Sequence, residues 1–283
     1  MAITLLDDQY VSQITKLFVI PPRPELLTEL NALMQQEEPS LVEMGNIIAK
    51  DISISAAVLK LINSPIFGIA RTVSNINQAV MFLGFDRIYG LVQGIKLKQS
   101  FAGKSSISLE RFWDTSEEIA QVALFIGSQI KTKVPVESLY TLGLFHDAGV
   151  PLMAMKFQNY IHVLVESNKN YDHSLVELEE KYFQTNHAIV GYFLASGWNL
   201  PKELCTLILR HHDLTFLDKK ESSIEQMTFS ILKMAENIVH TERRYVAAPD
   251  WVYLKEAVLD VLGITNYEYN DIKEDAIELV IGN

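Results

Sequence analysis

Two clusters of histidine and aspartate stand out in the sequence, because both side chains bind divalent metal ions. His146 is followed directly by Asp147, and His211 and His212 precede a second aspartate. Another histidine, His187, lies between these clusters. Imidazole and carboxylate together suit Zn, Mn or Fe, and pairs of such ions activate water and clamp phosphoryl oxygens. These residues therefore indicate a metal-dependent phosphoryl site, provided that the fold brings them together.

A structural role for the same histidines is the alternative. A single histidine on a helix is more often a hydrogen-bonded core residue, or a cation at the negative end of the helix dipole, than a metal ligand. His146 and His211 lie on otherwise apolar faces, where an unpaired polar group is costly. Each needs a partner, and the sequence leaves open whether that partner is a metal ion or a hydrogen-bonding group.

The remaining histidines and the single cysteine are not expected to form a functional site. We interpret His162, His173 and His240 as surface or cap residues. The single cysteine, Cys205, follows an apolar helical pattern and is expected to be a small buried side chain. The sequence contains no glycine-rich loop of the kind that binds nucleotide phosphates.

Helices must position the candidate ligands, because apolar residues recur at helical spacing along most of the sequence and sustained strand-like alternation is absent. Capping residues mark helix starts: Asp51 and Asn186 precede apolar stretches, and Ser40 with Glu43 matches a capping box. Gly84 indicates a break. The predicted fold class is all-α.

Two of these predicted helices carry the histidine clusters. One is predicted to begin at Pro135, to carry His146 on its inner face and to end near Gly149. The other is predicted to begin at Pro201 and to end with His211. The candidate ligands therefore lie near helix ends, where they are able to converge.

A small, polar and aperiodic segment at residues 102–108 is the best candidate for an internal boundary. It divides the sequence into an N-terminal helical subdomain, residues 1–105, and a second helical subdomain, residues 106–283. Because the connection is short and both flanks are apolar-faced helices, we expect the two parts to share an interface and not to fold independently.

Composition narrows the classes of function. Of 283 residues, 48% are hydrophobic, which excludes wholesale disorder. The net charge of −11 disfavours general binding of nucleic acid. One cysteine permits no intrachain disulfide, the sequence start does not match a secretory signal, and no apolar run is long enough to insert into a membrane. We therefore expect a cytoplasmic protein.

Several motifs are similar to those of one protein family. In the first half they are residues 21–24 (PPRP), 47–51 (IIAKD), 59–65 (LKLINSP), 76–80 (INQAV) and 83–84 (LG). In the second half they are residues 112–113 (FW), 146–147 (HD), 187–191 (HAIVG), 198–201 (WNLP) and 211–213 (HHD), with Glu179 before an aromatic stretch. Over about residues 14–245 the sequence resembles the HDOD domain, a non-catalytic branch of the HD metal-dependent phosphohydrolase superfamily. The resemblance implies an all-α, HD-like bundle with an N-terminal helical subdomain packed on an HD-type subdomain.

The sequence also departs from the HD pattern. HD phosphohydrolases carry a metal-binding histidine before the His-Asp pair, and the matching position here is Thr115, whose hydroxyl is a poor ligand. The last family aspartate matches Glu236, which is longer by one methylene. The resemblance thus implies a degraded site with the candidate metal ligands His146, Asp147, His187, His211, His212 and Glu236. Two-metal relatives have one set of ligands for each ion. The set that consists of Asp147, His187, His211 and His212 is more complete here than the set for the adjacent ion.

The resemblance also limits the expected activity. Phosphodiesterases of the family that hydrolyse cyclic di-GMP carry a lysine soon after His-Asp and a Gly-Tyr-Pro signature after the histidine pair. Here Val150 follows Gly149, and residues 214–216 are Leu-Thr-Phe, so we do not expect that activity.

We therefore expect a regulatory module of bacterial signal transduction that binds a signalling protein or a small phosphorylated or nucleotide ligand without turnover. The length leaves no room for an appended receiver or cyclase domain, so its input is expected to come from binding. The expected cofactor is a weakly or partly bound divalent ion (Zn, Mn, Fe, Ni or Mg), or none. Two alternatives stay open: a metal-dependent phosphohydrolase acting as a phosphodiesterase or phosphatase, and a purely structural histidine cluster.

Overall fold

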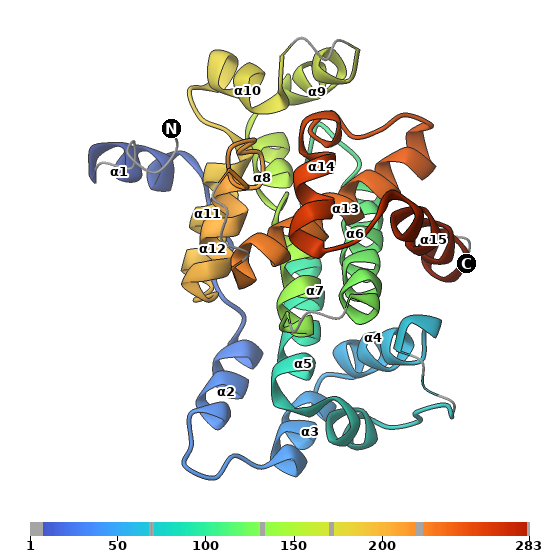
Figure 1. Cartoon of the computed structure of the whole chain (residues 1–283). Coiled ribbons are helices and arrows are strands. Elements are labelled where there is room, and N and C mark those ends of the chain that lie inside the picture. Colours follow the sequence, from blue (N-terminus) through green and yellow to red (C-terminus); the bar gives the residue numbers. More distant parts are fainter. Residues whose placement is uncertain are drawn as a thin grey trace.

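The computed structural model describes residues 8–67, 69, 71–130, 134–169, 173–218 and 223–281. Within these ranges the chain forms helices joined by turns and contains no β-strand (Figure 1). The all-α prediction is confirmed. No helix in the described ranges combines the length and the apolar character needed to cross a membrane.

The N-terminal part consists of short helices and one long, bent helix. They are α1 (Asp8–Leu17), α2 (Glu25–Met34), α3 (Leu41–Ala49), α4 (Ile52–Ile62) and α5 (Ile76–Gln99), with a 3₁₀ turn at Pro65–Phe67. The predicted caps are present, since Ser40 accepts the Glu43 amide and Asp51 accepts the Ile54 amide. At Gly84 the backbone has φ +79°, which bends α5 where the sequence indicated a break.

The second part holds the candidate ligands. Its helices are α6 (Leu109–Gln129), α7 (Val136–Phe145), α8 (Gly149–Lys156), α9 (Tyr160–Lys169), α10 (Leu175–Phe183), α11 (His187–Gly197), α12 (Lys202–Arg210), α13 (Ile224–Arg244), α14 (Trp251–Leu262) and α15 (Asn266–Ala276), followed by a π-helical turn at Ile277–Ile281. The prediction that one helix runs to Gly149 was wrong, because α7 ends at Phe145. His146 and Asp147 lie in a turn, and α8 begins at Gly149.

One hydrophobic core spans both parts of the chain. The last half of α5 packs against α7 in the centre of the molecule (Figure 1). The approach is close at Gly94, where a Cβ atom would lie 2.2 Å from the Leu144 side chain. Farther along the chain, the Trp198 indole donates to the Pro21 carbonyl at 2.8 Å.

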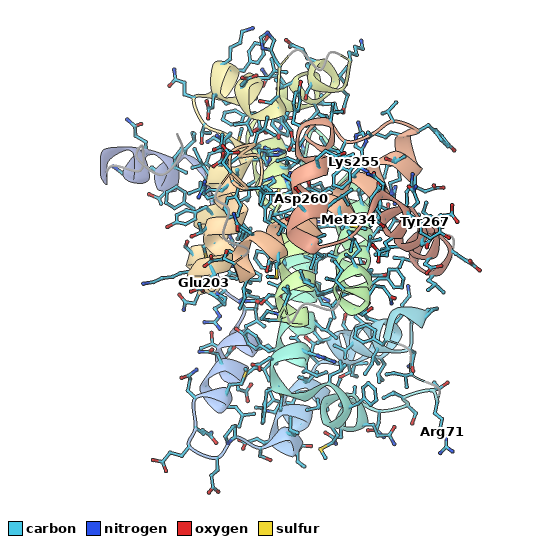
Figure 2. The ribbon with its side chains drawn as sticks, in the orientation of Figure 1. Arg71, Glu203, Met234, Lys255, Asp260 and Tyr267 are labelled. Atoms are coloured by element: carbon cyan, nitrogen blue, oxygen red, sulfur yellow. The ribbon has the colours of Figure 1, made fainter. Side chains whose placement is uncertain are left out.

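Helix α13 is the central helix of the second part and contacts α6, α7 and α14. Met234 on this helix is fully buried, whereas Tyr267 on α15 projects from the periphery (Figure 2). One face of α13 is polar although it is buried, and it consists of Gln226, Ser230, Lys233 and Asn237. Buried polar groups usually have internal partners, and one of these residues, Lys233, leads to the functional site.

Candidate metal centre

Four of the predicted ligands converge on one point. Asp147, His187, His211 and His212 each offer a ligand atom, and these atoms all lie within 4.8 Å of one another. Asp147 comes from the turn after α7, His187 begins α11, and the histidine pair follows α12. The group therefore forms where the ends of three helices meet.

The separations within this group suit ligands of a single ion. Asp147 Oδ1 lies 3.3 Å from His187 Nε2 and 3.2 Å from His211 Nε2. His187 Nε2 lies 3.0 Å from His212 Nε2 and 3.4 Å from His211 Nε2. Ligands about 2.0–2.1 Å from one ion are about 3.0 Å apart in octahedral and about 3.4 Å apart in tetrahedral geometry. One carboxylate and three imidazoles are also a donor set typical of Zn, Mn or Fe.

The outer nitrogen of each histidine is held by an acceptor, which directs Nε2 toward the group. His211 Nδ1 lies 2.6 Å from the Ile208 carbonyl, and His212 Nδ1 lies 2.8 Å from Asp250 Oδ2. Because a carbonyl only accepts hydrogen bonds, His211 carries its proton on Nδ1 when neutral and keeps Nε2 free. Outer partners of this kind fix the orientation of histidine ligands in metal sites.

Glu179 performs this role for His187. The Glu179 carboxylate is fully buried and accepts from both Nδ1 of His187, at 2.6 Å, and the His187 backbone amide, at 3.0 Å. Its other oxygen accepts from the Tyr160 hydroxyl. Burial alone would lower the pKa of His187, but Glu179 and Asp147 outweigh it and raise the pKa to about 10. Without an ion, His187 is therefore protonated near neutral pH.

The pKa values of Asp147 and His211 are shifted in directions that suit metal binding. Burial would raise the pKa of Asp147, but the surrounding histidines hold it well below its usual range. Burial, together with the neighbouring His212, lowers the pKa of His211 well below that of free histidine. An anionic carboxylate and a neutral imidazole are the forms that bind metals.

Two further predicted ligands adjoin the group but are not members of it. His146 is buried, its Nδ1 lies 2.8 Å from the Gly143 carbonyl, and its Nε2 lies 3.4 Å from Asp147 Oδ2. The same Nε2 lies 3.4 Å from Glu236 Oε1. Thr115, at the position of the missing family histidine, donates its hydroxyl to the Arg111 carbonyl within α6.

Three residues around the centre were not assigned a role from the sequence. Glu179 was noted only as part of a motif, and Asp250 and Lys233 were not noted. Lys233 bonds Glu236 Oε2 at 2.7 Å and Asp250 Oδ2 at 3.0 Å. The sequence signal for such a network is a lysine between two apolar residues, Leu232 and Met234, of a helical pattern.

A close approach between helices sets the position of His187. A Cβ atom on Gly149 would lie 1.9 Å from the His187 carbonyl oxygen and 2.8 Å from the Gly191 amide nitrogen. Only glycine allows α8 and α11 to pack at this distance. Because Asp147 lies two residues before Gly149, this contact fixes the distance between two of the candidate ligands, Asp147 and His187.

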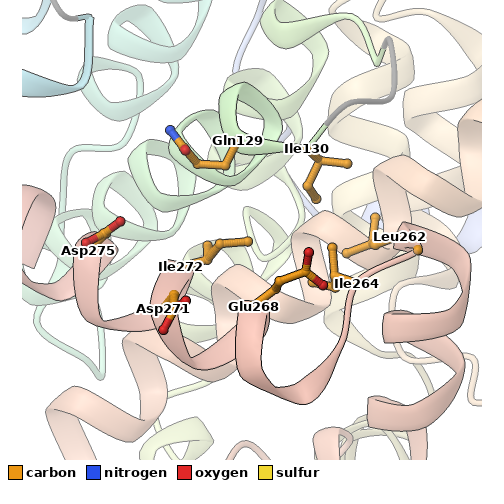
Figure 3. Close-up of a pocket in the computed structure, with 9 residues that line it drawn as sticks. Gln129, Ile130, Leu262, Ile264, Glu268, Asp271, Ile272 and Asp275 are labelled. Carbon is orange, nitrogen blue, oxygen red and sulfur yellow. The ribbon is translucent and has the colours of Figure 1, made fainter.

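A separate pocket of about 300 Å³ lies away from the metal group, at the end of α6 and beside α15 (Figure 3). Ile130 and Leu262 contribute to its apolar wall. Glu268, Asp271 and Asp275 project from α15 at its rim. None of the metal-group residues lines this pocket, so the two features are distinct.

Comparison with known proteins agrees with this architecture. A family model of the HDOD domain matches residues 20–214. An uncharacterized protein from Treponema pallidum (strain Nichols) is 23% identical over 195 residues, which are 69% of this chain and 38% of that protein. The match thus spans well under half of that relative.

Two solved structures are similar over 96% of the chain. A proposed phosphohydrolase from Shewanella amazonensis SB2B has a TM-score of 0.71 at 17% identity, with 94% of it covered. A proposed signal transduction protein from Marinobacter aquaeolei VT8 has a TM-score of 0.70 at 18% identity, with 62% of it covered. At these identities the likeness shows the fold. Because the family model matches more than two thirds of the sequence, the chain belongs to the HDOD domain family.

Proposed function

We propose that this protein is a regulatory module of bacterial signal transduction in the cytoplasm. It binds a signalling protein or a small phosphorylated or nucleotide ligand without chemical turnover. Its centre holds one weakly bound divalent ion on Asp147, His187, His211 and His212. When bound, that ion supplies a fixed positive charge for a phosphorylated ligand.

The observation that carries this proposal is the extent of the ligand group. Among the described residues, four ligand atoms lie close enough to share an ion, and His146 and Glu236 are outside that set. Hydrolysis by a two-metal site requires a pair of ions about 3.5–4 Å apart, which clamp the attacking and leaving oxygens. A centre with ligands for one ion favours binding over turnover.

The second candidate is a metal-dependent phosphohydrolase, and a specific observation favours it. His146 Nε2 faces both Asp147 and Glu236 at 3.4 Å, which is a separation suited to ligands of an adjacent ion. The structural alternative, in which the histidines bind no ion, predicts that the purified protein contains and takes up no metal.

Turnover separates the two main candidates. The full chain with Mn²⁺ is assayed for hydrolysis of cyclic di-GMP and of bis(p-nitrophenyl) phosphate, beside the His146→Ala variant. We expect no hydrolysis above the level of His146→Ala. Metal-dependent turnover that is abolished by His146→Ala would establish the hydrolase instead. In parallel, calorimetry with Mn²⁺-loaded protein and a panel of nucleotides is expected to detect binding that leaves the ligand intact.

A further inference from the structure

Lys233 is an unusual residue to find beside a cation site. Its side chain is 2% exposed, on the central helix α13. Burying an ammonium group is costly unless opposite charges surround it. Here Nζ lies 2.7 Å from Glu236 Oε2 and 3.0 Å from Asp250 Oδ2, and the Phe229 ring centroid lies 5.9 Å away.

Both carboxylates paired with Lys233 also contact histidines of the centre. The other oxygen of Glu236 lies 3.4 Å from His146 Nε2. The oxygen of Asp250 that contacts Lys233 also lies 2.8 Å from His212 Nδ1. Lys233 therefore connects His146, through Glu236, with His212, through Asp250, in one continuous chain of contacts.

The groups that face His146 could serve as ligands of an adjacent ion. Its Nε2 lies 3.4 Å from Asp147 Oδ2 and 3.4 Å from Glu236 Oε1, the separation of two ligands on one tetrahedral ion. The residues for an adjacent ion are thus close together despite the threonine at position 115. Glu236, however, is already neutralised by the Lys233 ammonium.

The charges around the centre lead to the same conclusion. Asp147, Glu179, Glu236 and Asp250 are four carboxylates in one connected network. In that network, as far as the described residues show it, Lys233 is the single lysine or arginine. One divalent ion and one lysine together balance three of the four negative charges, and the single charge that remains is too little to balance a second divalent ion.

We propose that the Lys233 ammonium stands in for a second divalent ion and thereby limits this centre to one ion. The inference rests on the one-ion site of the proposed function and deepens it. Lys233, Glu236 and Asp250 lie beyond residue 214, where the match to the HDOD model ends, whereas His146 and Asp147 lie within it. An ammonium group supplies charge but has no open coordination position, so it neither binds nor activates water as a metal ion does.

The test is the number of Mn²⁺ ions bound by the full chain, measured by native mass spectrometry and calorimetry. Wild type is expected to bind one ion. Lys233→Met, which keeps an unbranched side chain one atom shorter and removes its charge, is expected to bind two. Lys233→Arg keeps the charge and is expected to bind one. The double variant Lys233→Met/Glu236→Gln also loses the carboxylate of the second ion and is expected to return to one.

A matched control replaces a second lysine, Lys96, which is partly buried and also forms an ion pair. Lys96 bonds Asp51 at 2.8 Å, and neither residue belongs to the network around the metal group, so Lys96→Met is expected to bind one ion. If Lys233→Met is poorly folded in EDTA, its melting temperature still decides the question. Addition of Mn²⁺ should raise the melting temperature of Lys233→Met by more than it raises that of wild type. In the double variant the increase should equal that of wild type.

The outcomes separate this inference from the function on which it rests. One ion in wild type and one in Lys233→Met, with equal melting shifts, would overturn the role of Lys233 and leave the one-ion site intact. No ion in wild type would overturn both. Two ions in Lys233→Met and one in each of the other variants would support both.

Discussion

Replacing Gly149 by alanine tests whether the approach of α8 to α11 holds the metal ligands in position. The new Cβ atom would lie 1.9 Å from the His187 carbonyl oxygen, whereas such contacts are not found below 3.0 Å. The backbone of α11 must therefore move by about 1.1 Å relative to Gly149. Metal–ligand distances tolerate about 0.2 Å. The displacement thus exceeds the tolerance about fivefold and separates His187 from Asp147.

Two effects of known size are expected from Gly149→Ala. Overpacking of a close interface costs about 1–3 kcal/mol of unfolding free energy. Misplacing a ligand is expected to weaken Mn²⁺ binding at least tenfold, or about 1.4 kcal/mol. Denaturant unfolding in EDTA measures the first effect, and calorimetric titration with Mn²⁺ measures the second.

Gly191 provides the matched control on the facing helix. A Cβ atom there would meet the Ile208 side chain at 3.3 Å and the Gly149 amide at 3.4 Å, so small adjustments accommodate it. Gly191→Ala is expected to change stability by less than about 1 kcal/mol, since alanine also favours the helix, and to leave Mn²⁺ affinity unchanged. Wild-type Mn²⁺ affinity in Gly149→Ala, or an equal loss of affinity in both variants, would show that the contact between α8 and α11 does not position the ligands.

Three further predictions follow from other parts of the structure. Because the pKa of His187 is raised to about 10, an ion must displace its proton at any lower pH, so Mn²⁺ affinity should rise with pH up to about 10. Glu179→Gln, which removes the main cause of the raised pKa, should release fewer protons per ion when calorimetry is repeated in buffers of different ionisation enthalpy; equal release in the two proteins would contradict this. Asp51→Ala loses both the α4 cap and the ion pair to Lys96, and should lower the unfolding free energy by about 1–2 kcal/mol. Asp51→Asn keeps the cap and should cost less than about 1 kcal/mol, whereas equal losses in denaturant unfolding would argue against the cap. Fragments on either side of residues 102–108 should not fold alone, because α5 and α7 share one core; a thermal transition reproduced by either isolated fragment would contradict this.

The fold was largely predictable because local chemistry specifies it. Asp51 caps a helix through its own side chain, and Gly84 takes a positive φ that disfavours other residues. Such features depend on neighbours within a few positions. The end of α7 was predicted too late, because apolar periodicity continues past Phe145. The chain turns there since Gly149 must approach α11, a contact between residues 38 or more positions apart.

The site was predictable only in part, for the same physical reason. The histidine and aspartate pairs can be recognised from residue type alone, and four of the six predicted ligands form the group. Their outer partners cannot be recognised in this way. The bond from His212 to Asp250 joins residues 38 positions apart, and an aspartate before a helix has many other uses. Lys233 is still harder to assign from sequence. Glu236 lies one turn later on the same helix, an ordinary spacing for a surface ion pair, and only packing brings Asp250 to the same ammonium group.

Metal analysis of the wild-type chain distinguishes a centre that holds one weakly bound ion from the two-ion centre of a hydrolase. The protein is loaded with Mn²⁺ or Zn²⁺, dialysed at neutral pH without chelator, and its metal content is measured against protein concentration. No more than one ion per chain is expected, with partial occupancy that falls further when dialysis is repeated at about pH 5. The ion must displace the proton of His187, and protons compete more strongly for that nitrogen as the pH falls. Two ions per chain, both retained through dialysis at neutral pH, would contradict the one-ion centre and favour a phosphohydrolase.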